Sequence, residues 1–443
     1  MFNNKQLKKL IIPLIIEQLL AVTVGMADIM MVARAGETAV SGVSLVDTLN
    51  VLLITLFSSL ATGGAVVAAQ YLGHKETKEA CKAANQLLLA VGCISLLIMG
   101  ISLIGNQAIL RTIYGSKVEK AVMDNAVTYF YITALSFPFL AIYNSCAALF
   151  RTMGNSKVSM MVSIIMNIIN VGGNAILILG FRMGVAGVAY PTLVSRAVAA
   201  VIMLGLIHNA KNPIHISNIF HQRFDWKMIR RILNIGVPNG LENSVFQIGK
   251  VLVQGITASF GTVAITANAV GNTIAGLEVI PGSAIGLAMI TVVGQCVGAG
   301  DLEQAKKYVI KLMKITYIII IILNMGVLLL REPIIGLYNL SSETEALAMQ
   351  LVIYHSICCC IIWPISFCLP NALRAANDVK NTMLISIISM WVWRIGFSFI
   401  LAYSFKLGLM GVWIAMTIDW LFRGICFVTR FLSGKWKRHA YIS

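Results

Sequence analysis

Twelve long apolar runs, separated by short polar stretches, occupy most of the 443-residue chain. A helix needs about 20 apolar residues to cross a hydrocarbon core of about 30 Å, and these runs are of that length or longer. The pattern therefore predicts an all-α, polytopic membrane protein with twelve transmembrane helices. We place these helices at residues 10–33, 39–72, 86–109, 126–150, 158–180, 184–207, 232–257, 264–297, 308–330, 346–372, 381–403 and 408–430.

The second half of the chain repeats the first. Shifting residues 13–73 by 225 positions onto residues 238–298, without a gap, gives eleven identities. Self-similarity at a fixed offset is typical of an internal duplication. The identical pairs are Pro13/Pro238, Glu17/Glu242, Ala33/Ala258, Gly36/Gly261, Ala39/Ala264, Thr48/Thr273, Leu52/Leu277, Ser58/Ser283, Val67/Val292, Gln70/Gln295 and Gly73/Gly298.

Later segments continue the repeat. The segment ending in Arg151 (ALFR) returns as the segment ending in Arg374 (ALR), and Gly184 and Gly187 return as Gly408 and Gly411. Six spans in each half then predict two pseudo-symmetric six-helix lobes. We expect the lobes to comprise residues 1–208 and 232–443, joined by a linker at residues 209–231.

The charges of the loops predict the orientation in the membrane. Assigning the loops alternately to the two sides places 23 Lys and Arg residues on the side of the N-terminus and 7 on the other. The positive-inside rule then puts both termini and the linker in the cytoplasm of a plasma (inner) membrane protein. Because each half has an even number of spans, the halves form a parallel repeat about an axis along the membrane normal.

The linker offers two interpretations. His208, His215 and His221 near it can form a metal site, but a solvated cytoplasmic linker accounts for them more simply. Its last part, residues 225–231, predicts a short amphipathic helix in the membrane interface before the seventh span.

Composition excludes several classes of protein. The chain is 58 % apolar and 12 % charged, with a mean hydropathy of +0.83. Its net charge of +16 lies mainly in short loops, which does not indicate a nucleic-acid surface. The nine cysteines are scattered, most of them within apolar runs. This distribution argues against a disulfide framework and against a zinc site. We find no Walker lysine, no helical His-x-x-x-His pair and no nucleophile–base constellation, so we expect no enzyme, no catalytic residue and no metal site.

Two acids lie in the first span. Glu17 and Asp28 are eleven residues apart, about three helical turns, and therefore share one face of the helix. An acid in hydrocarbon costs about 2.5–3.5 kcal/mol on insertion scales, so each needs a reason to be there. A buried carboxylate can bind Na⁺ or a proton, or it can be held by amides for packing alone. The candidate neighbours of Asp28 line one face of the fifth span and are Asn167, Asn170 and Asn174. These amides can instead hold neighbouring helices together by hydrogen bonds.

The second lobe carries its own charged candidates, Glu242, Lys250 and Glu278. Glu242, like Glu17, lies four residues after a proline. It either interacts with the backbone carbonyl group that the proline leaves without a hydrogen bond, or it relays a proton or cation. We expect Lys250 and Glu278 to form a buried ion pair, because the repeat places Gly25 and Leu53 opposite them.

Three further acids remain, of which Asp47 and Asp378 are secondary candidates for the site. Asp419 and Arg423, spaced i, i+4 on the last span, are expected to satisfy each other. Asp47 lies near the outer part of the second span. Asp378 is expected to act as a gate or a helix cap at the cytoplasmic end of the tenth span.

These residues together resemble the multidrug and toxic compound extrusion (MATE) family over nearly the whole chain. The resemblance implies a twelve-helix, two-lobe antiporter that exports amphipathic, often cationic compounds against an inward proton or sodium gradient. The segments that carry it are residues 12–17 (IPLIIE), 26–28 (MAD), 39–42 (AVSG), 70–73 (QYLG), 238–242 (PNGLE), 280–286 (IPGSAIG) and 295–298 (QCVG), with the paired Leu/Phe-Arg segments.

The family's motifs also suggest roles for single residues. Asp28 matches the first-span aspartate that the family uses to bind the coupling ion in its N-terminal lobe. Asn174 stands where some relatives have an aspartate, and Phe246 stands where many relatives have the acid of the second lobe. The chain therefore has fewer negative charges than those relatives at both places.

We accordingly predict a cation-coupled antiporter, driven by H⁺ or Na⁺, that exports amphipathic, cationic drugs or toxic metabolites by alternating access. Its partners are a small amphipathic organic substrate and membrane lipid; no nucleic acid and no organic cofactor are expected, and the protein is expected to be monomeric. The alternative is a lipid-linked oligosaccharide flippase of the same superfamily, which needs a cationic cavity.

Overall fold

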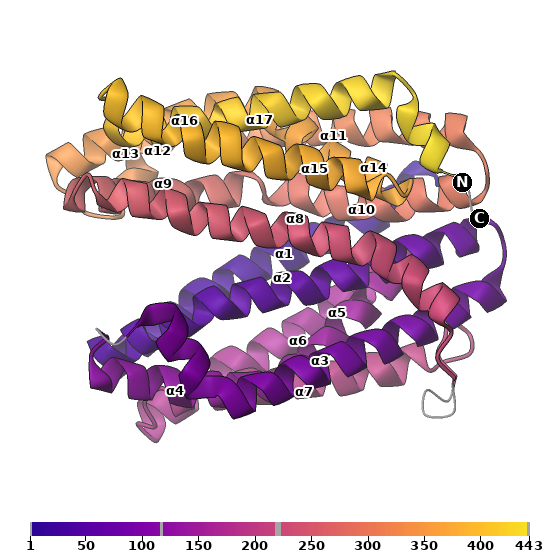
Figure 1. Cartoon of the computed structure of the whole chain (residues 1–443), viewed down its shortest axis with the longest axis horizontal. Coiled ribbons are helices and arrows are strands. Elements are labelled where there is room, and N and C mark those ends of the chain that lie inside the picture. Colours follow the sequence, from indigo (N-terminus) through magenta and orange to yellow (C-terminus); the bar gives the residue numbers. More distant parts are fainter. Residues whose placement is uncertain (1, 116–117, 218–222, 441–443) are drawn as a thin grey trace. The chain divides into compact units, whose positions relative to one another are not determined.

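The computed structural model describes residues 2–115, 118–217 and 223–440, and in these residues every regular element is helical. The helices form two compact units (Figure 1). The N-terminal unit comprises Asn3–Gly240, and the C-terminal unit comprises Leu241–Ser443 together with Phe2. The division falls inside one helix, α8, beyond the linker at residues 209–231. The expected all-α, polytopic class is confirmed.

Seven helices and the first part of α8 build the N-terminal unit. A 3₁₀ turn, η1 (Ala33–Ala35), follows α1, and a π-helical segment, η2 (Ala175–Gly180), continues α6. The α-helices are α1 (Asn4–Val32), α2 (Glu37–Gly73), α3 (Thr77–Tyr114), α4 (Lys120–Ala134), α5 (Phe137–Thr152), α6 (Ser156–Asn174), α7 (Ala186–Ile207) and α8 (Trp226–Ala258).

The C-terminal unit is built from the rest of α8 and the helices that follow it. Several of its spans change helix type on the way across, through the π-helical segments η4 (Pro364–Cys368), η5 (Met390–Gly396) and η6 (Ile400–Ser404). The remaining elements are α9 (Thr262–Glu278), α10 (Ile280–Gly298), α11 (Leu302–Leu329), α12 (Arg331–Gly336), α13 (Ser342–Trp363), α14 (Leu369–Ala375), α15 (Val379–Ser389), α16 (Phe397–Phe399), α17 (Gly408–Leu432) and η7 (Lys435–His439).

The expected twelve spans can be followed on these helices. Ten described helices are long and apolar enough to cross a membrane, and the pair α4 and α5, bent by 49°, makes an eleventh. The remaining expected span lies on α8, which is not among those helices. The span expected at residues 264–297 is broken at Val279 into α9 and α10. Pro281 explains the break, because it lacks the N–H that would bond the carbonyl of Leu277.

Backbone conformation supports the duplication independently of side chains. Gly36 (φ 105°) and Gly261 (φ 90°), 225 residues apart, both precede a helix in a conformation that only glycine adopts readily. Other positive-φ residues fall into pairs 223–225 positions apart: Lys75/Gly300, Gly115/Asn339, Gly154/Asn377, Arg182/Lys406 and Gly184/Gly408. The two copies therefore turn at the same places.

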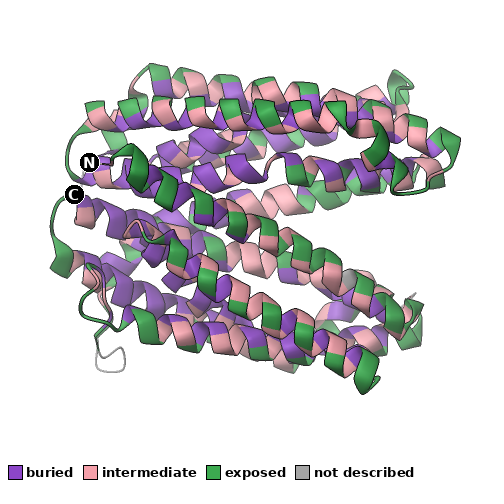
Figure 2. Cartoon of the chain, turned by 180° about the vertical axis from the view of Figure 1, so that it is seen from behind, coloured by how far each residue is buried: buried purple, intermediate pink, exposed green. Residues whose placement is uncertain are grey.

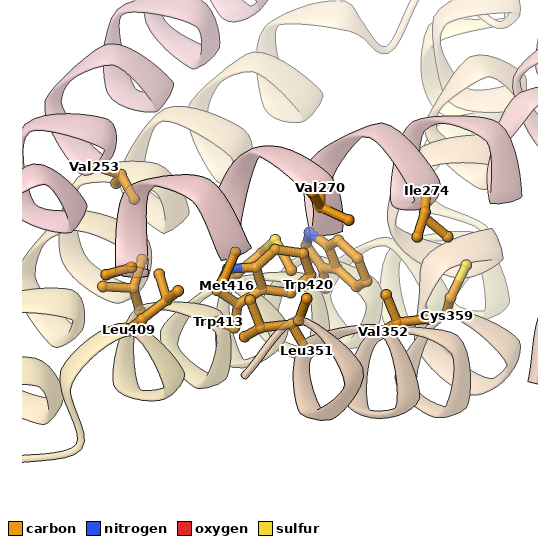
Figure 3. Packing of buried hydrophobic residues seen from close by; sticks show 14 of the residues in the cluster. Val253, Val270, Ile274, Leu351, Val352, Cys359, Leu409, Trp413, Met416 and Trp420 are labelled. Carbon is orange, nitrogen blue, oxygen red and sulfur yellow. The ribbon is translucent and has the colours of Figure 1, made fainter. Parts of the chain in front are cut away.

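Buried and exposed side chains separate a core from an outer face in each unit. Figure 2 shows buried and exposed positions alternating along single helices. Large apolar side chains such as Ile104, 92 % exposed, and Leu329, 77 % exposed, suit lipid rather than water. Figure 3 shows the core of the C-terminal unit, where Trp413, Met416 and Trp420 of α17 lie between Val270 of α9 and helix α13.

The linker lies against α3 within the N-terminal unit. The Gln86 side chain donates to the carbonyl of Arg223 (2.9 Å) and accepts from the N–H of Asp225 (3.0 Å). Lys82 lies 2.6 Å from the Asp225 carboxylate, and its hydrogen bond holds the pKa of Asp225 below its usual range. The expected short interfacial helix is wrong, because Trp226 begins a single helix that continues to Ala258.

Of the three histidines, His215 contacts Cys81 Sγ at 3.7 Å and the carbonyl of Asn212 at 3.3 Å. His208 follows the last residue of α7. His221 lies outside the described residues.

Helices α2 and α8 approach closely within the N-terminal unit. A Cβ atom added at Gly63 would lie 2.6 Å from the carbonyl oxygen of Ile232 and 2.8 Å from the backbone nitrogen of Gly236. We therefore expect Gly63→Ala to push two helix backbones apart and to cost about 1–3 kcal/mol of stability. Thermal unfolding in detergent measures the effect. Gly92→Ala on α3 is the control, since its Cβ would meet no atom within 4 Å; equal losses in both variants would contradict the expectation.

Candidate functional site

Asp28 of α1 lies in a polar network at the end of α6. Asn174 Nδ2 donates to Asp28 Oδ1 at 2.6 Å and to Asn170 Oδ1 at 3.3 Å. Asn170 in turn donates to the Thr192 hydroxyl of α7 at 3.1 Å. The structure thus brings Asp28, Asn170 and Asn174 together, as their positions in the sequence predicted. Asn167, the third asparagine of that face, has a buried Nδ2 without a hydrogen-bond partner.

This network offers oxygen ligands to a small cation. Asn174 is fully buried, and its Oδ1 accepts no hydrogen bond. A buried amide oxygen without a donor, next to a carboxylate, suits a hard cation such as Na⁺, or a proton carried on the carboxylate. Asn174 is the last residue of α6, and the π-helical segment begins at the next residue, Ala175.

A second acid of the N-terminal unit, Asp47 of α2, has other hydrogen-bond partners than this network. It accepts hydrogen bonds from Tyr129 (3.2 Å) and Asn50 (3.4 Å) and lines a cavity of about 280 Å³. Arg196 of α7 donates to Ser136 at 2.8 Å, and both Asp28 and Asp47 interact with it electrostatically. The interior of this unit therefore holds two carboxylates around one guanidinium.

Glu17 and Glu242 form repeat-related ion pairs. Glu17 lies 3.4 Å from Arg151 and accepts from Ser159 at 2.9 Å. Glu242 lies 2.8 Å from Arg374 and accepts from Ser386 at 2.6 Å. Both glutamates are buried, 8 % and 4 % exposed. The arginines are those of the repeated Leu/Phe-Arg segments, so the glutamate and the arginine that recur in the sequence are partners in space.

The expected pair of Lys250 and Glu278 is wrong. Glu278, the last residue of α9, accepts hydrogen bonds from His355 Nδ1 and Ser356 Oγ of α13, both at 2.5 Å. Among the described residues Lys250 has no carboxylate within ion-pair distance; its Nζ lies 5.0 Å from the centre of the Phe246 ring. The break at Val279 ends α9 at Glu278, beside His355.

A double-mutant cycle tests this correction. We expect the stability losses of Lys250→Met and Glu278→Gln to add within about 0.5 kcal/mol, because the two residues share no partner. Glu278→Gln and His355→Ala should instead be coupled by about 0.5–3 kcal/mol, because those two side chains are in contact. Thermal unfolding of the three single and two double variants decides between the pairs, and coupling between Lys250 and Glu278 would contradict the structure.

The expected pair of Asp419 and Arg423 is also wrong. Asp419 lies 3.6 Å from Arg394 and accepts a hydrogen bond from Ser389, whereas Arg423 lies 3.6 Å from Glu242. Helical spacing permits the local pair, but each side chain meets a closer partner on a neighbouring element.

Asp378 does not cap α15 with its side chain. It forms an ion pair with Arg430 near the end of α17 and accepts from Asn381 at 2.8 Å. These contacts join the loop before α15 to α17, so the expectation of a helix cap is wrong.

The C-terminal unit contains a cavity of about 430 Å³. Its charged lining comes from Lys250 of α8 and Arg394 of η5, and His355 adds an imidazole. No carboxylate belongs to its lining in the described residues. Aromatic rings form much of the wall: Phe246, Trp363, Phe367, Trp413 and Trp420.

Several of these residues were not predicted from the sequence. Arg151 and Arg374 were visible as repeated residues, but their partners were not assigned. His355 lies in the middle of an apolar run, and a titratable residue there is a signal that was not used. The sequence does not single out the hydroxyl partners, because serine and threonine are common in transmembrane helices. These partners are Thr192, Ser159, Ser386 and Ser356.

Comparison with known proteins places the chain among transporters. The MatE family model matches it twice, at residues 13–176 and 238–400. An uncharacterized transporter of Bacillus subtilis is 27 % identical over 433 residues, covering 96 % of this chain and 93 % of that protein. A probable multidrug resistance protein of Thermotoga maritima, called NorM, is 25 % identical and covers 99 % and 94 %. A multidrug resistance MATE family transporter solved in an outward-facing conformation superposes with a TM-score of 0.90 at 18 % identity, covering 97 % and 96 %.

Proposed function

The chain belongs to the MATE family of transporters, because the MatE model matches both of its halves. We propose that it is a cation-coupled antiporter. It exports small amphipathic organic compounds, cationic ones among them, by alternating access. The inward flow of Na⁺ or H⁺ supplies the free energy. Asp28 binds the coupling cation.

The observation that carries this proposal is the Asp28–Asn174 contact of 2.6 Å with the unpartnered Asn174 Oδ1 beside it. A ligand shifts a two-state equilibrium only by its differential affinity for the two states. Cation binding between α1 and α6 can supply such a difference if the contact between these helices changes during transport. Asp47, which lines its own cavity, is the second acid available to a cationic substrate.

The chain is a multi-pass plasma membrane protein. We propose that both termini and the linker at residues 209–231 face the cytoplasm, on the strength of the 23 to 7 distribution of Lys and Arg. Labelling of single cysteines placed in the linker of a cysteine-free variant, in intact cells and in inverted vesicles, tests the orientation. Labelling from outside intact cells would overturn it.

The coupling is tested by transport in vesicles. Purified protein is reconstituted with an organic cation such as ethidium, and either a proton gradient or a sodium gradient is imposed. Acceleration by one gradient, abolished by the matching ionophore, supports the proposal and identifies the ion. Ethidium movement at the same rate with and without both gradients would overturn it.

The flippase alternative rests on one observation, the cationic cavity lined by Lys250 and Arg394. Its volume of about 430 Å³ falls in the range of about 300–1,000 Å³ typical of drug-sized ligands. The head group of a lipid-linked oligosaccharide is larger than that. Translocation of a short-chain lipid pyrophosphate by reconstituted protein, without any ion gradient, would favour the flippase.

A further inference from the structure

We propose that the cavity of the C-terminal unit is a binding site for an organic anion with an aromatic body, such as an aromatic carboxylate or sulfonate. This substrate class is opposite in charge to the cationic compounds expected from the acids of the N-terminal unit. The proposal stands on the residues of one unit and does not require the coupling mechanism.

The charge of the lining points to an anion. Lys250 has no carboxylate partner among the described residues, and its ammonium group and the Arg394 guanidinium lie 5.0 and 5.4 Å from the centre of the same Phe246 ring. Both cations therefore belong to the part of the cavity lining around Phe246. The fold does not need Lys250, since the repeat has Gly25 at the matching position. A charge in a membrane interior without a structural partner indicates function.

The carboxylates around the cavity do not cancel the positive charge of its lining. Asp419 neutralises Arg394 at 3.6 Å, and Glu278 is held by His355 and Ser356. The bases of the unit's interior are Lys250, Arg374, Arg394 and Arg423, and they face the carboxylates Glu242, Glu278 and Asp419. At least one positive charge therefore remains, at Lys250.

Two hydrogen-bond donors of the lining residues also lack an acceptor. Arg394 and Trp420 line the cavity at 8 % and 4 % exposure, and the Nε of the first and the Nε1 of the second have no acceptor. Trp413 Nε1 already uses the oxygen of Asn268 at 2.9 Å. A carboxylate or sulfonate supplies acceptors and negative charge together, whereas an ammonium ligand would add a further donor and a like charge.

The wall supplies the apolar part of the site. Trp363 and Phe367 are stacked with ring centres 5.3 Å apart, and Trp420 meets Phe367 edge-on at 5.7 Å. A Cβ at Gly282 would lie 2.3 Å from the Trp363 ring, so a glycine makes room for that indole. Flat aromatic surfaces around a few polar groups are typical of small-molecule sites.

The test compares two probes with one ring system and opposite charges, 2-naphthoate and 2-naphthylmethylammonium. Calorimetry on the purified full chain in detergent gives both affinities. We expect the wild type to prefer naphthoate by about tenfold or more, and Lys250→Met to lose about tenfold in naphthoate affinity. Lys227→Met is the matched control, because it removes an exposed lysine from the start of the same helix. It should bind as the wild type does.

A second variant guards against misfolding of the first. Asn272 lines the cavity, and Asn272→Asp is nearly isosteric and adds a carboxylate there. It should weaken naphthoate binding and strengthen binding of the ammonium probe. Equal affinities for both probes in the wild type, a preference for the ammonium, or naphthoate binding unchanged in Lys250→Met and Asn272→Asp would each overturn the proposal. Asp28→Asn should retain naphthoate binding, so a failure of ion coupling and a failure of this site give different results.

Discussion

Replacing Asp28 by asparagine is expected to abolish cation-coupled efflux while leaving the protein folded and inserted. The substitution keeps the size of the side chain and its contact with Asn174, but removes the only full charge of the network formed with Asn170 and Thr192. Removing a residue that only supports a cation ligand costs about 10–100-fold in cation affinity. Removing the charged ligand itself should therefore cost at least as much. Efflux under an imposed gradient and ²²Na⁺ binding measure the effect.

Asp124→Asn is the control for this prediction, because it removes an exposed acid from the same unit. Its transport should equal that of the wild type. Asn174→Leu should weaken cation binding by about 10–100-fold, as expected for a partner of the charged ligand. Efflux at the normal rate in Asp28→Asn, at normal expression, would remove Asp28 from the coupling mechanism.

The second large effect is expected on stability. Glu242→Gln should destabilise the C-terminal unit by roughly 3–5 kcal/mol, because removing one partner leaves buried charges uncompensated. Two arginines depend on this carboxylate, Arg374 at 2.8 Å and Arg423 at 3.6 Å, and they are 8 % and 3 % exposed. A lower thermal unfolding midpoint in detergent is the measurement.

The repeat provides the matched control. Glu17→Gln removes the equivalent glutamate, whose ion pair with Arg151 is longer, at 3.4 Å, so its loss should be smaller. The position equivalent to Arg423 in the first copy is Ala199, 224 residues earlier. Adding Arg423→Ala to Glu242→Gln should therefore restore part of the lost stability. Equal losses for both glutamates, without rescue, would show that Arg423 does not depend on Glu242.

The sequence by itself determined the class of fold and the duplication. Apolar runs long enough for the bilayer leave few alternatives to membrane helices, because backbone groups in hydrocarbon must bond within their own segment. The gap-free offset of 225 residues predicted that the two halves would turn alike, and the positive-φ pairs such as Gly36 and Gly261 do so. The asparagine face of the fifth span was also predictable, since i, i+3 and i+4 spacing is a local property of one helix.

Only the tertiary structure decided which charges meet. Helical spacing pairs Asp419 with Arg423, and the search for an acid paired Lys250 with Glu278, yet Glu242, Arg394 and His355 are the partners found. A partner across helices depends on the rotation of each helix about its axis and on where a helix breaks. Neither quantity is encoded in the periodicity of a single segment. One proline, Pro281, ends α9 where Glu278 meets His355, and this leaves Lys250 to the cavity.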